Sequence, residues 1–358
     1  MSSSHSSASP RAATGAAAFP YRRILVTGGA GFIGSALVWA LNRRGIERIV
    51  VVDRLGSDEK WRNLVPLAFE DYLEADDLMP RLTSGALGDF DCVLHMGACS
   101  ATTEKDASYL ARNNYEFTKD LATWALGHSA RFVYASSAAT YGAGAQGMLD
   151  VDEPDALTRL RPLNAYGWSK HVLDQYAAHH GLFARGAVGV KYFNVFGPNE
   201  AHKRDMRSLV HKAFEQVRDT GTVRLFKSYS PSYADGEQER DFLYVKDAVA
   251  MTLHLAAHPE ARGLYNLGSG RARTWLALAH ALFAAMGRPP RIEFIEMPEQ
   301  LRGKYQYHTQ ADIAKLRATG YAASVSELEA AVADYVKHYL LDDRRLGDPD
   351  AEADAPLG

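Results

Sequence analysis

The sequence is poor in cysteine and has no long hydrophobic run. Its 358 residues include only two cysteines, Cys92 and Cys99, which lie too close together for a useful disulfide and are too few for a metal framework. This usage fits a reducing compartment, so a cytoplasmic location is expected. No apolar run approaches the ~18–20 residues that span a bilayer, and we therefore expect no membrane segment.

The chain also carries little net charge of either sign. The formal net charge is −3, which gives no overall field favouring nucleic acid or an anionic membrane surface. The 13 histidines show no metal-ligand spacing such as H-E-x-x-H, so no metal site is expected. With 47% hydrophobic, 23% charged and 10% aromatic residues, the composition is that of a globular protein.

The two ends of the chain have a biased composition. Residues 1–20 are rich in Ser and Ala and lack the apolar core of a secretory signal, which predicts a disordered leader; an organelle transit peptide is the weaker alternative. Residues 342–358 are rich in Asp, Pro and Gly and predict a second loose tail.

Residues 21–195 alternate between short apolar runs and segments with helical periodicity. The runs that predict strands are residues 23–27, 48–53, 91–95, 131–136 and 187–193. Helical periodicity is found over residues 32–44, 106–127 and 169–181. Continuous rather than alternating apolar strands indicate a parallel sheet covered on both faces. The prediction is a doubly wound α/β domain of the Rossmann type.

The regular alternation breaks after about residue 195. Residues 196–341 predict a smaller α+β lobe that binds substrate, although later segments could complete part of the sheet. Its expected helices are residues 205–219, 246–258, 274–286, 309–318 and 325–341, and its expected strands are residues 223–226 and 291–295. Ser324 and Glu327 have the spacing of a capping box for the last helix.

A glycine-rich turn joins the first strand to the first helix. In TGGAGFIG (residues 27–34), Gly28, Gly31 and Gly34 fit G-x-x-G-x-x-G. Glycines here let the backbone approach a pyrophosphate at a helix N-terminus, where amides and the helix dipole favour negative charge. A tight structural turn is the alternative. Because Asp53 follows 19 residues after Gly34 at the end of the second strand, a dinucleotide site is favoured.

These residues alone do not decide whether the cofactor carries a 2′-phosphate. Asp53 suits a ribose 2′-hydroxyl, which predicts NAD. Arg54 could instead hold a 2′-phosphate with help from Lys60, which predicts NADP.

A tyrosine and a lysine one helical turn apart form the second constellation. Tyr166 and Lys170 share a helix face, and the ammonium should lower the pKa of the phenol, making it an acid/base near neutral pH. Tyr115 and Lys119 have the same spacing. Tyr166 is preferred because it lies 29 residues after Ser137, at the end of a strand, where open α/β sheets place ligands.

Longer strings now point to a family. TGGAGFIG, GACS (97–100), YASSAATYG (134–142) and YGWSK (166–170) resemble the extended short-chain dehydrogenase/reductase superfamily. KYFNVFGPNEAHK (191–203), GEQERDFLYVKD (236–247), YNLGSGRA (265–272) and LRGKYQYHTQAD (301–312) are similar to its ADP-glyceromanno-heptose 6-epimerases, and the likeness runs from about residue 21 to 340.

This resemblance implies an isomerase that inverts carbon 6 of ADP-heptose for the lipopolysaccharide inner core. It implies one bound nicotinamide cofactor per subunit, with NADP preferred over NAD, and a homo-oligomer, of which a pentamer is one form. The catalytic set would be Ser137, Tyr166, Lys170 and Lys203. The cofactor would meet Gly28, Gly31, Phe32, Ile33, Gly34, Asp53, Arg54, Lys60, Ala98, Cys99, Asn113 and Lys170. The nucleotide sugar would meet Ser137, Asn194, Lys203, Lys212, Phe226, Arg240 and Tyr305.

Several positions depart from the family pattern. Arg54 stands in place of an asparagine, Ala75 in place of a lysine and Lys191 in place of an arginine, and Met96, Asp205 and Lys212 also differ. These departures bear on cofactor preference and heptose contacts rather than on the reaction class.

Simpler roles remain open for two of these residues. Arg240 could bind a diphosphate through its guanidinium fork or only pair with Asp241. Lys203 lies in a charged loop, where a solvated lysine is the ordinary case.

Three other functions compete with the 6-epimerase. One is a nucleotide-sugar 4-epimerase. Another is a 4,6-dehydratase, which is disfavoured because residues 138–141 lack the acidic pair of that class. The third is a non-catalytic dinucleotide sensor, which is disfavoured because both Tyr166 and Lys170 are kept.

Overall fold

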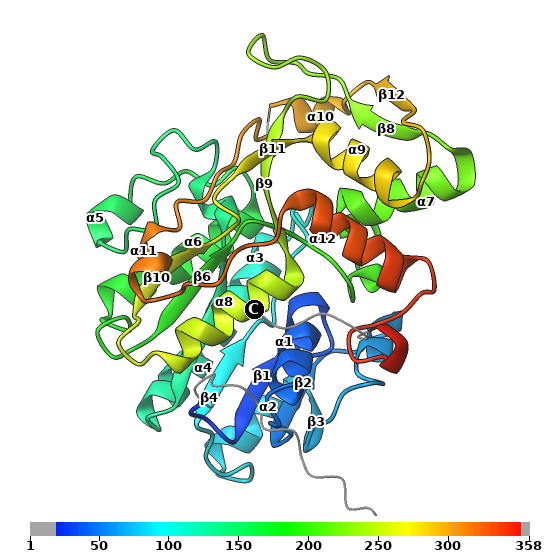
Figure 1. The fold of residues 1–358 in the computed structure, drawn as a ribbon. Coiled ribbons are helices and arrows are strands. Elements are labelled where there is room, and N and C mark those ends of the chain that lie inside the picture. Colours follow the sequence, from blue (N-terminus) through cyan, green and yellow to red (C-terminus); the bar gives the residue numbers. More distant parts are fainter. Residues whose placement is uncertain (1–18, 304, 352–358) are drawn as a thin grey trace, which may run out of the picture.

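The computed structural model describes residues 19–303 and 305–351, and a seven-stranded sheet forms its centre (Figure 1). Its strands are β1 (Ile24–Thr27), β2 (Ile49–Asp53), β3 (Asp71–Glu74), β4 (Cys92–His95), β5 (Arg131–Ser137), β6 (Val188–Tyr192) and β10 (Gly263–Leu267). Their order is β10-β6-β5-β4-β1-β2-β3, and every neighbouring pair is parallel. The chain therefore reverses its direction across the sheet between β1 and β4, where open α/β sheets bind ligands.

Alternate strand residues build two separate cores, one on each face of the sheet. Ile24 and Val26 of β1 belong to the core that includes α1 (Phe32–Asn42) and α8 (Val245–Ala257). Leu25 between them belongs to the opposite core. That core includes residues of α2 (Ala75–Thr83), α4 (Phe117–Gly127) and α6 (Ala165–His179). Because both faces are covered, the strands are apolar on both sides, as a parallel sheet requires.

The doubly wound α/β fold predicted from the sequence is confirmed. All five expected strands are present, and β3 and β10 were missed. β10 is a short run, GLYNL, that contains the polar Asn266. It pairs with β6, but residues 193–262, which belong to the lobe and α8, separate the two strands in the sequence. The sequence from 196 onward is thus shared between the lobe and the sheet.

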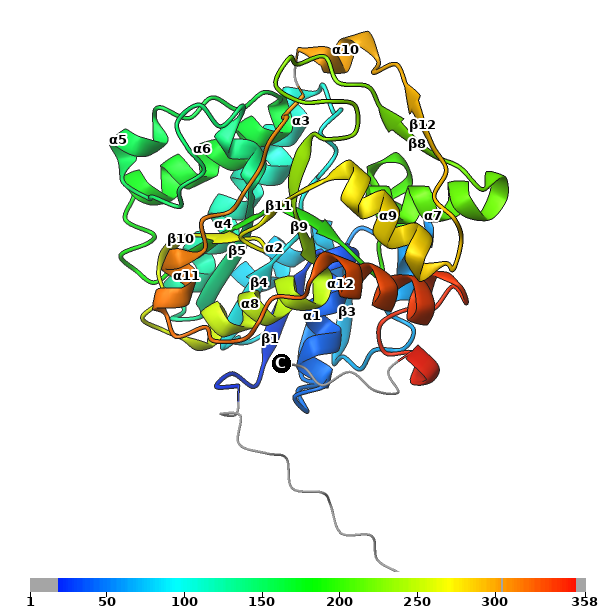
Figure 2. The same ribbon diagram turned by 45° about the horizontal axis from the view of Figure 1, so that its top comes forward.

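The smaller lobe gathers on one side of the molecule, away from α5 (Pro154–Leu157) and α6 (Figures 1 and 2). Its main helices are α7 (Leu209–Thr220), α9 (Trp275–Ala285), α10 (Glu299–Arg302) and α12 (Leu328–Tyr335). β8 (Val223–Phe226) pairs with β12 (Ile292–Ile295), and β9 (Glu239–Tyr244) pairs with both β7 (Asn194–Phe196) and β11 (Ala272–Thr274). The remaining short helices include η1 (Glu59–Asn63), α3 (Ala107–Leu110), η2 (Ala111–Glu116), η4 (Ala201–Met206) and α11 (Ala314–Ala318).

The predicted capping box at the last helix is wrong. α12 begins at Leu328 with Glu327 as its N-cap residue, and no side chain of the described residues caps it. The Glu327 carboxylate contacts Arg271 instead of reaching back toward Ser324. The amide of Ser326 donates to Asp247 (3.0 Å). Tertiary partners have therefore replaced the local cap.

The C-terminal segment is packed where the sequence predicted a loose tail. The Leu346 side chain is fully buried, and its amide donates to Asn199 Oδ1 (3.0 Å). Residues 349–351 form a short 3₁₀ helix with Ala351 buried. Two apolar anchors and a backbone hydrogen bond outweigh the Asp/Pro/Gly composition. The predicted leader, up to residue 18, and residues 352–358 of the tail lie outside the described residues.

We expect Leu346→Ala to lower the free energy of unfolding by about 2–4 kcal/mol, because it leaves a cavity in the core. Leu341→Ala is the matched control: that side chain is 58% exposed, and the change should cost within about 0.5 kcal/mol. Urea unfolding followed by circular dichroism measures both. Equal, small effects of the two variants would mean that the segment is as loose as its composition indicated.

Candidate active site

A cavity of about 880 Å³ lies where the sheet's carboxyl edge meets the lobe. Its wall includes the turns after β1, β4 and β5 and side chains from α7, β8 and α9. The predicted site residues that line it are Gly28, Gly31, Phe32, Ile33, Gly34, Asp53, Lys60, Ala98, Cys99, Ser137, Tyr166, Lys170, Asn194, Lys203, Lys212, Phe226 and Tyr305. Three predicted site residues lie outside this lining: Arg54, Asn113 and Arg240. Arg54 donates to Asn113, and Arg240 lies against the ring of Tyr305, a lining residue.

The glycine turn brings two backbone segments into unusually close contact. Gly28 has φ +65°, and a Cβ there would lie 2.6 Å from the amide nitrogen of Gly97. A Cβ at Gly34 would lie 2.0 Å from the Gly28 carbonyl oxygen. These glycines are therefore required by the turn's own packing, and the turn also forms part of the cavity wall.

The N-terminus of α1 faces this cavity and suits a phosphate. Within the described residues, no side chain caps the helix at Gly31, and its first turn has no acidic residue. The amides that start an α-helix lack internal partners and favour an anion. Asp53 stabilises the turn by accepting from the amides of Ala30 (3.0 Å) and Gly31 (3.1 Å). These residues fit the pyrophosphate of a dinucleotide.

Two cations border the position expected for the ribose. Lys60 Nζ lies 3.0 Å from Asp53 Oδ1. The guanidinium of Arg54 pairs with Asp76 and donates to Asn113 Oδ1 (2.9 Å). Asn113 thus orients Arg54 and does not itself line the cavity. Each cation already forms an ion pair with a carboxylate, so charges of both signs lie beside the expected ribose position.

Helix α6 delivers Tyr166 and Lys170 to the same cavity. It begins after Asn164, whose side chain accepts from the amide of Gly167 (2.8 Å). Lys170 Nζ donates to the carbonyl oxygen of Ala135 (2.7 Å), which attaches the helix to β5. Burial lowers the pKa of Lys170 to about 8, and Asp174 opposes this shift.

The expected lowering of the Tyr166 pKa by Lys170 is wrong for this state of the site. Burial raises the pKa of the Tyr166 phenol, and a hydrogen bond with Ser137 only partly opposes the shift. Desolvation dominates because a phenolate loses its hydration in this position. The phenol is therefore a weaker acid here than in solution.

Tyr115 and Lys119, the second pair with this spacing, pack against a neighbouring helix instead of lining the cavity. Lys119 Nζ lies 5.3 Å from the centre of the Tyr115 ring and 5.9 Å from that of Tyr176. The rings of Tyr115 and Tyr176 pack edge to face. Both members of the pair lie outside the cavity lining.

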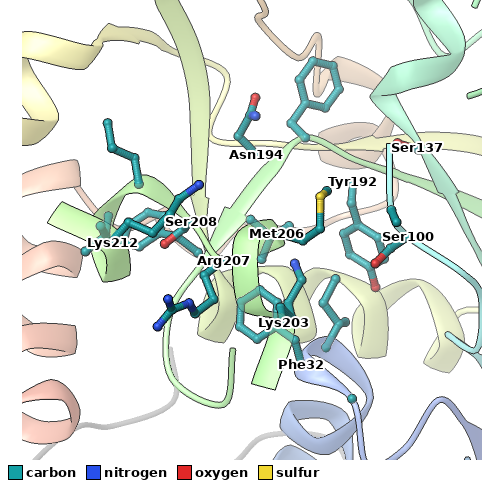
Figure 3. Close-up of a pocket in the computed structure, with 18 of the residues that line it drawn as sticks. Phe32, Ser100, Ser137, Tyr192, Asn194, Lys203, Met206, Arg207, Ser208 and Lys212 are labelled. Carbon is teal, nitrogen blue, oxygen red and sulfur yellow. The ribbon is translucent and has the colours of Figure 1, made fainter. Parts of the chain in front are cut away.

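Lys203 stands on the opposite side of the cavity from Ser137 (Figure 3). Its Nζ lies 5.1 Å from the centre of the Phe32 ring. Burial lowers the pKa of Lys203, Glu200 opposes the shift and Lys212 adds to it. Lys203 is therefore a half-buried side chain of the cavity wall with a lowered pKa, rather than a fully exposed lysine.

Arg240 sits in an aromatic clamp beside the cavity. Its guanidinium carbon lies 4.9 Å from the Tyr305 ring centre and 5.5 Å from that of Trp275, and Trp275 Nε1 donates to Tyr305 (2.8 Å). The side chain is buried and has no carboxylate partner among residues 19–303 and 305–351. The alternative pairing with Asp241 is not formed, because that carboxylate accepts from the amides of Ser269, Gly270 and Ala311.

Sequence reasoning missed several residues of the wall. Trp275, Arg207 and Gln216 all line the cavity. A tryptophan at the first position of a helix ordinarily signals a core residue, and the other two look like surface residues on an amphipathic helix and its leading loop. Arg207 and Gln216 reach the cavity because α7 packs against α9 and β8, which line the same cavity.

The described part of the chain contains no group of three or more His, Cys, Asp or Glu side chains arranged to hold a metal ion. None of its helices has the length and apolar character needed to cross a membrane. Cys92 and Cys99 are both free thiols.

Comparison with known proteins adds a family to this geometry. Residues 24–268 match the NAD dependent epimerase/dehydratase family. The ADP-L-glycero-D-manno-heptose-6-epimerase of Nitratidesulfovibrio vulgaris strain Hildenborough is 51% identical over 317 residues, covering 88% of this chain and 97% of the relative. The enzyme of that name from Fusobacterium nucleatum is 44% identical, covering 88% of this chain and 98% of the relative.

The solved structures agree with this assignment. The crystal structure of Helicobacter pylori ADP-L-glycero-D-manno-heptose-6-epimerase matches with a TM-score of 0.74 at 28% identity, covering 88% of this chain and 96% of that one. The chain belongs to the NAD dependent epimerase/dehydratase family and, within it, to the ADP-L-glycero-D-manno-heptose-6-epimerases.

Proposed function

We propose that the protein inverts carbon 6 of ADP-glycero-manno-heptose, from D-glycero to L-glycero, by transient oxidation to a 6-keto intermediate, and so supplies heptose for the lipopolysaccharide inner core. The observation that carries the proposal is that Tyr166 and Lys203 line one cavity with the glycine turn. Inversion needs a proton handled on either face of a single carbon, and these are two proton-exchanging groups from different elements. The relatives' names supply the identity of the sugar.

Oxidation is the chemically feasible route at this carbon. Carbon 6 bears a hydroxyl and has no adjacent carbonyl to stabilise a carbanion, so removal of its proton would be prohibitively slow. A nicotinamide held by the glycine turn would supply the hydride acceptor and donor. Tyr166, assisted by Lys170 and Ser137, would take the hydroxyl proton as the hydride leaves carbon 6 and the ketone forms. Once the ketone has rotated in the cavity, the same hydride would return to the opposite face of carbon 6, and Lys203 would donate a proton to the oxygen.

The nucleotide part of the substrate has a candidate anchor in Arg240. A buried guanidinium without a carboxylate partner in the described chain is costly, and a diphosphate would compensate it. Arg240 lies behind the cavity wall against the Tyr305 ring. Asn194, Lys212, Phe226 and Tyr305 line the cavity itself and are proposed to contact the nucleotide sugar. Three attributes accompany this function as proposals: a cytoplasmic location, one cofactor per subunit and a homo-oligomeric assembly.

For the cofactor we propose NADP, with NAD as the alternative. Arg54 and Lys60 border the ribose position, and the guanidinium could exchange Asp76 for a 2′-phosphate. Arg54 in place of the family's asparagine would compensate for Ala75 in place of its lysine, because both positions border the end of β2.

The Tyr166→Phe variant should lose roughly 10²–10⁴-fold in turnover, because it removes only a proton-transfer group. Its dissociation constant for the dinucleotide should stay nearly unchanged. Tyr115→Phe is the matched control, because it removes the hydroxyl of the second Tyr/Lys pair, and it should leave turnover and the dissociation constant nearly unchanged. Steady-state epimerisation and fluorescence titration measure both, and the reverse pattern would show that the wrong pair had been chosen.

Hydride transfer makes a clear isotopic prediction. In heavy water, the inverted product should carry no deuterium at carbon 6, because the hydride stays on the cofactor and does not exchange with solvent. Substrate deuterated at carbon 6 should keep its label through inversion. Mass spectrometry and proton NMR of the product measure this. Solvent deuterium at that carbon in proportion to turnover would rule the oxidative route out.

Loss of the Arg54 guanidinium should weaken NADP binding selectively. We expect Arg54→Ala to raise the Kd for NADP roughly tenfold, the effect of losing one charge-assisted hydrogen bond, with little change for NAD. Arg62→Ala is the control, because that arginine pairs with Asp343 and lies outside the cavity. Isothermal titration of the wild type and the two variants with each cofactor gives the six constants. Equal weakening of both cofactors, or tighter wild-type binding of NAD, would contradict the proposal.

A further inference from the structure

The loop that carries Lys203 is closed on itself by a buried carboxylate. Glu200 accepts from the amide of Gly197 (3.3 Å) at the start of the loop and from the amide and hydroxyl of Ser208 (both 2.6 Å) at its end. The Lys203 amide donates to the Glu200 carbonyl oxygen (3.0 Å). These bonds fix the loop's shape, but they do not fix its distance from the sheet.

Asn63 ties this loop to the glycine turn. Its side-chain nitrogen donates to the carbonyl oxygens of Ala30, inside the turn, and of Asn199, inside the loop (both 3.0 Å). Asn63 is 2% exposed. Since both partners are carbonyls, only the NH₂ side of the amide can face them. Asn63 ends η1, the same short helix that carries Lys60.

Asn199 makes a second, independent tie. Its side-chain nitrogen donates to Ser35 Oγ (2.9 Å), and that hydroxyl donates to the carbonyl oxygen of Phe32 (3.2 Å). Its side-chain oxygen accepts from the amide of Leu346, which fixes the orientation of the amide because a backbone N–H can only donate. The residue has φ +75°, a conformation that asparagine tolerates better than most side chains.

We infer that Asn63 and Asn199 are positioning residues that hold Lys203 at the cavity wall by fastening its loop to the dinucleotide turn. The inference rests on the proposed function for the role of Lys203. One tie ends on Ala30 and the other, through the Ser35 hydroxyl, on Phe32, and these two residues flank Gly31. The Phe32 ring is also the surface against which the Lys203 ammonium lies. The turn therefore sets the position of the second proton-exchanging group as well as that of the cofactor.

The position matters because proton transfer requires close approach. A displacement of about 1 Å in a reacting group can cost on the order of a hundredfold in rate. A loop held only by Glu200 could shift as a unit while keeping its internal hydrogen bonds. The two ties hold the loop at different points, so loss of either should let part of the loop move and expose Lys203 without unfolding it.

Two variants and one control test the inference. Asn63→Ala removes the first tie. Asn199→Gly removes the second and keeps the backbone relaxed, because glycine accepts φ +75°. The control is Asn42→Ala: Asn42 also donates to two backbone carbonyls, those of Ile46 (2.9 Å) and Ala68 (2.8 Å), but it lies at the far end of α1.

The first readout is the pH dependence of Lys203 acetylation, followed by peptide mass spectrometry on the dinucleotide-loaded full chain. The charged groups that face Lys203 are Glu200 on its own loop and Lys212 on α7, and both are unchanged in the variants. Because burial holds the Lys203 pKa down, release of the loop should move the labelling midpoint to higher pH. We expect this shift in Asn63→Ala and Asn199→Gly and not in Asn42→Ala.

The second readout separates positioning from general damage. Epimerisation by Asn63→Ala and Asn199→Gly should fall roughly ten- to a hundredfold, while the dinucleotide Kd changes by less than about threefold, the effect of one modest hydrogen bond. The control should keep wild-type values. A wild-type labelling midpoint in both tie variants overturns the inference, whatever their activity.

Failure of the proposed function would look different. If the wild type did not epimerise ADP-heptose, the labelling midpoints would still report whether the ties hold Lys203, because they need no substrate. If Asn63→Ala failed to fold, Asn199→Gly would decide the inference alone, since it leaves the Asn63 bridge to the Asn199 carbonyl in place.

Discussion

The close packing of backbone at the glycine turn is the constraint on which the rest of the site depends. Gly28 and Gly34 approach each other so closely that a Cβ on the second would overlap the carbonyl oxygen of the first. This contact directs the start of α1 into the crevice between β1 and β4 and leaves its amides facing the cavity. Asp53 accepts hydrogen bonds from the turn's amides, and the Asn63 side chain donates to one of the turn's carbonyl oxygens.

A second set of contacts attaches α6 to the sheet. Lys170 and Asp174, one turn apart on α6, bind successive positions of β5: the lysine donates to Ala135, and the carboxylate accepts from the Tyr134 and Ser136 hydroxyls (2.9 and 2.8 Å). The carboxylate is buried, and Lys191 neutralises it at 2.6 Å. Removing one partner of such a pair would leave an uncompensated charge in the core.

Burial shifts the pKa values of two groups in the cavity wall. Tyr166 and Lys203 both line the cavity between the carboxyl edge of the sheet and the lobe, and burial raises the pKa of the phenol and lowers that of the amine. The neutral form of each group is favoured as a result.

Local patterns in the sequence were enough to predict the alternation of strands and helices, the glycine turn followed by Asp53, and the spacing of Tyr166 and Lys170. These signals are readable because they reflect short apolar runs, a repeat of 3.6 residues and a turn that only glycine can make. Contacts between residues distant in sequence could be seen only in the folded chain. The Leu346 amide donates to Asn199, and the Lys203 ammonium lies against the Phe32 ring of α1. Such contacts join residues more than a hundred positions apart, and no local periodicity encodes them.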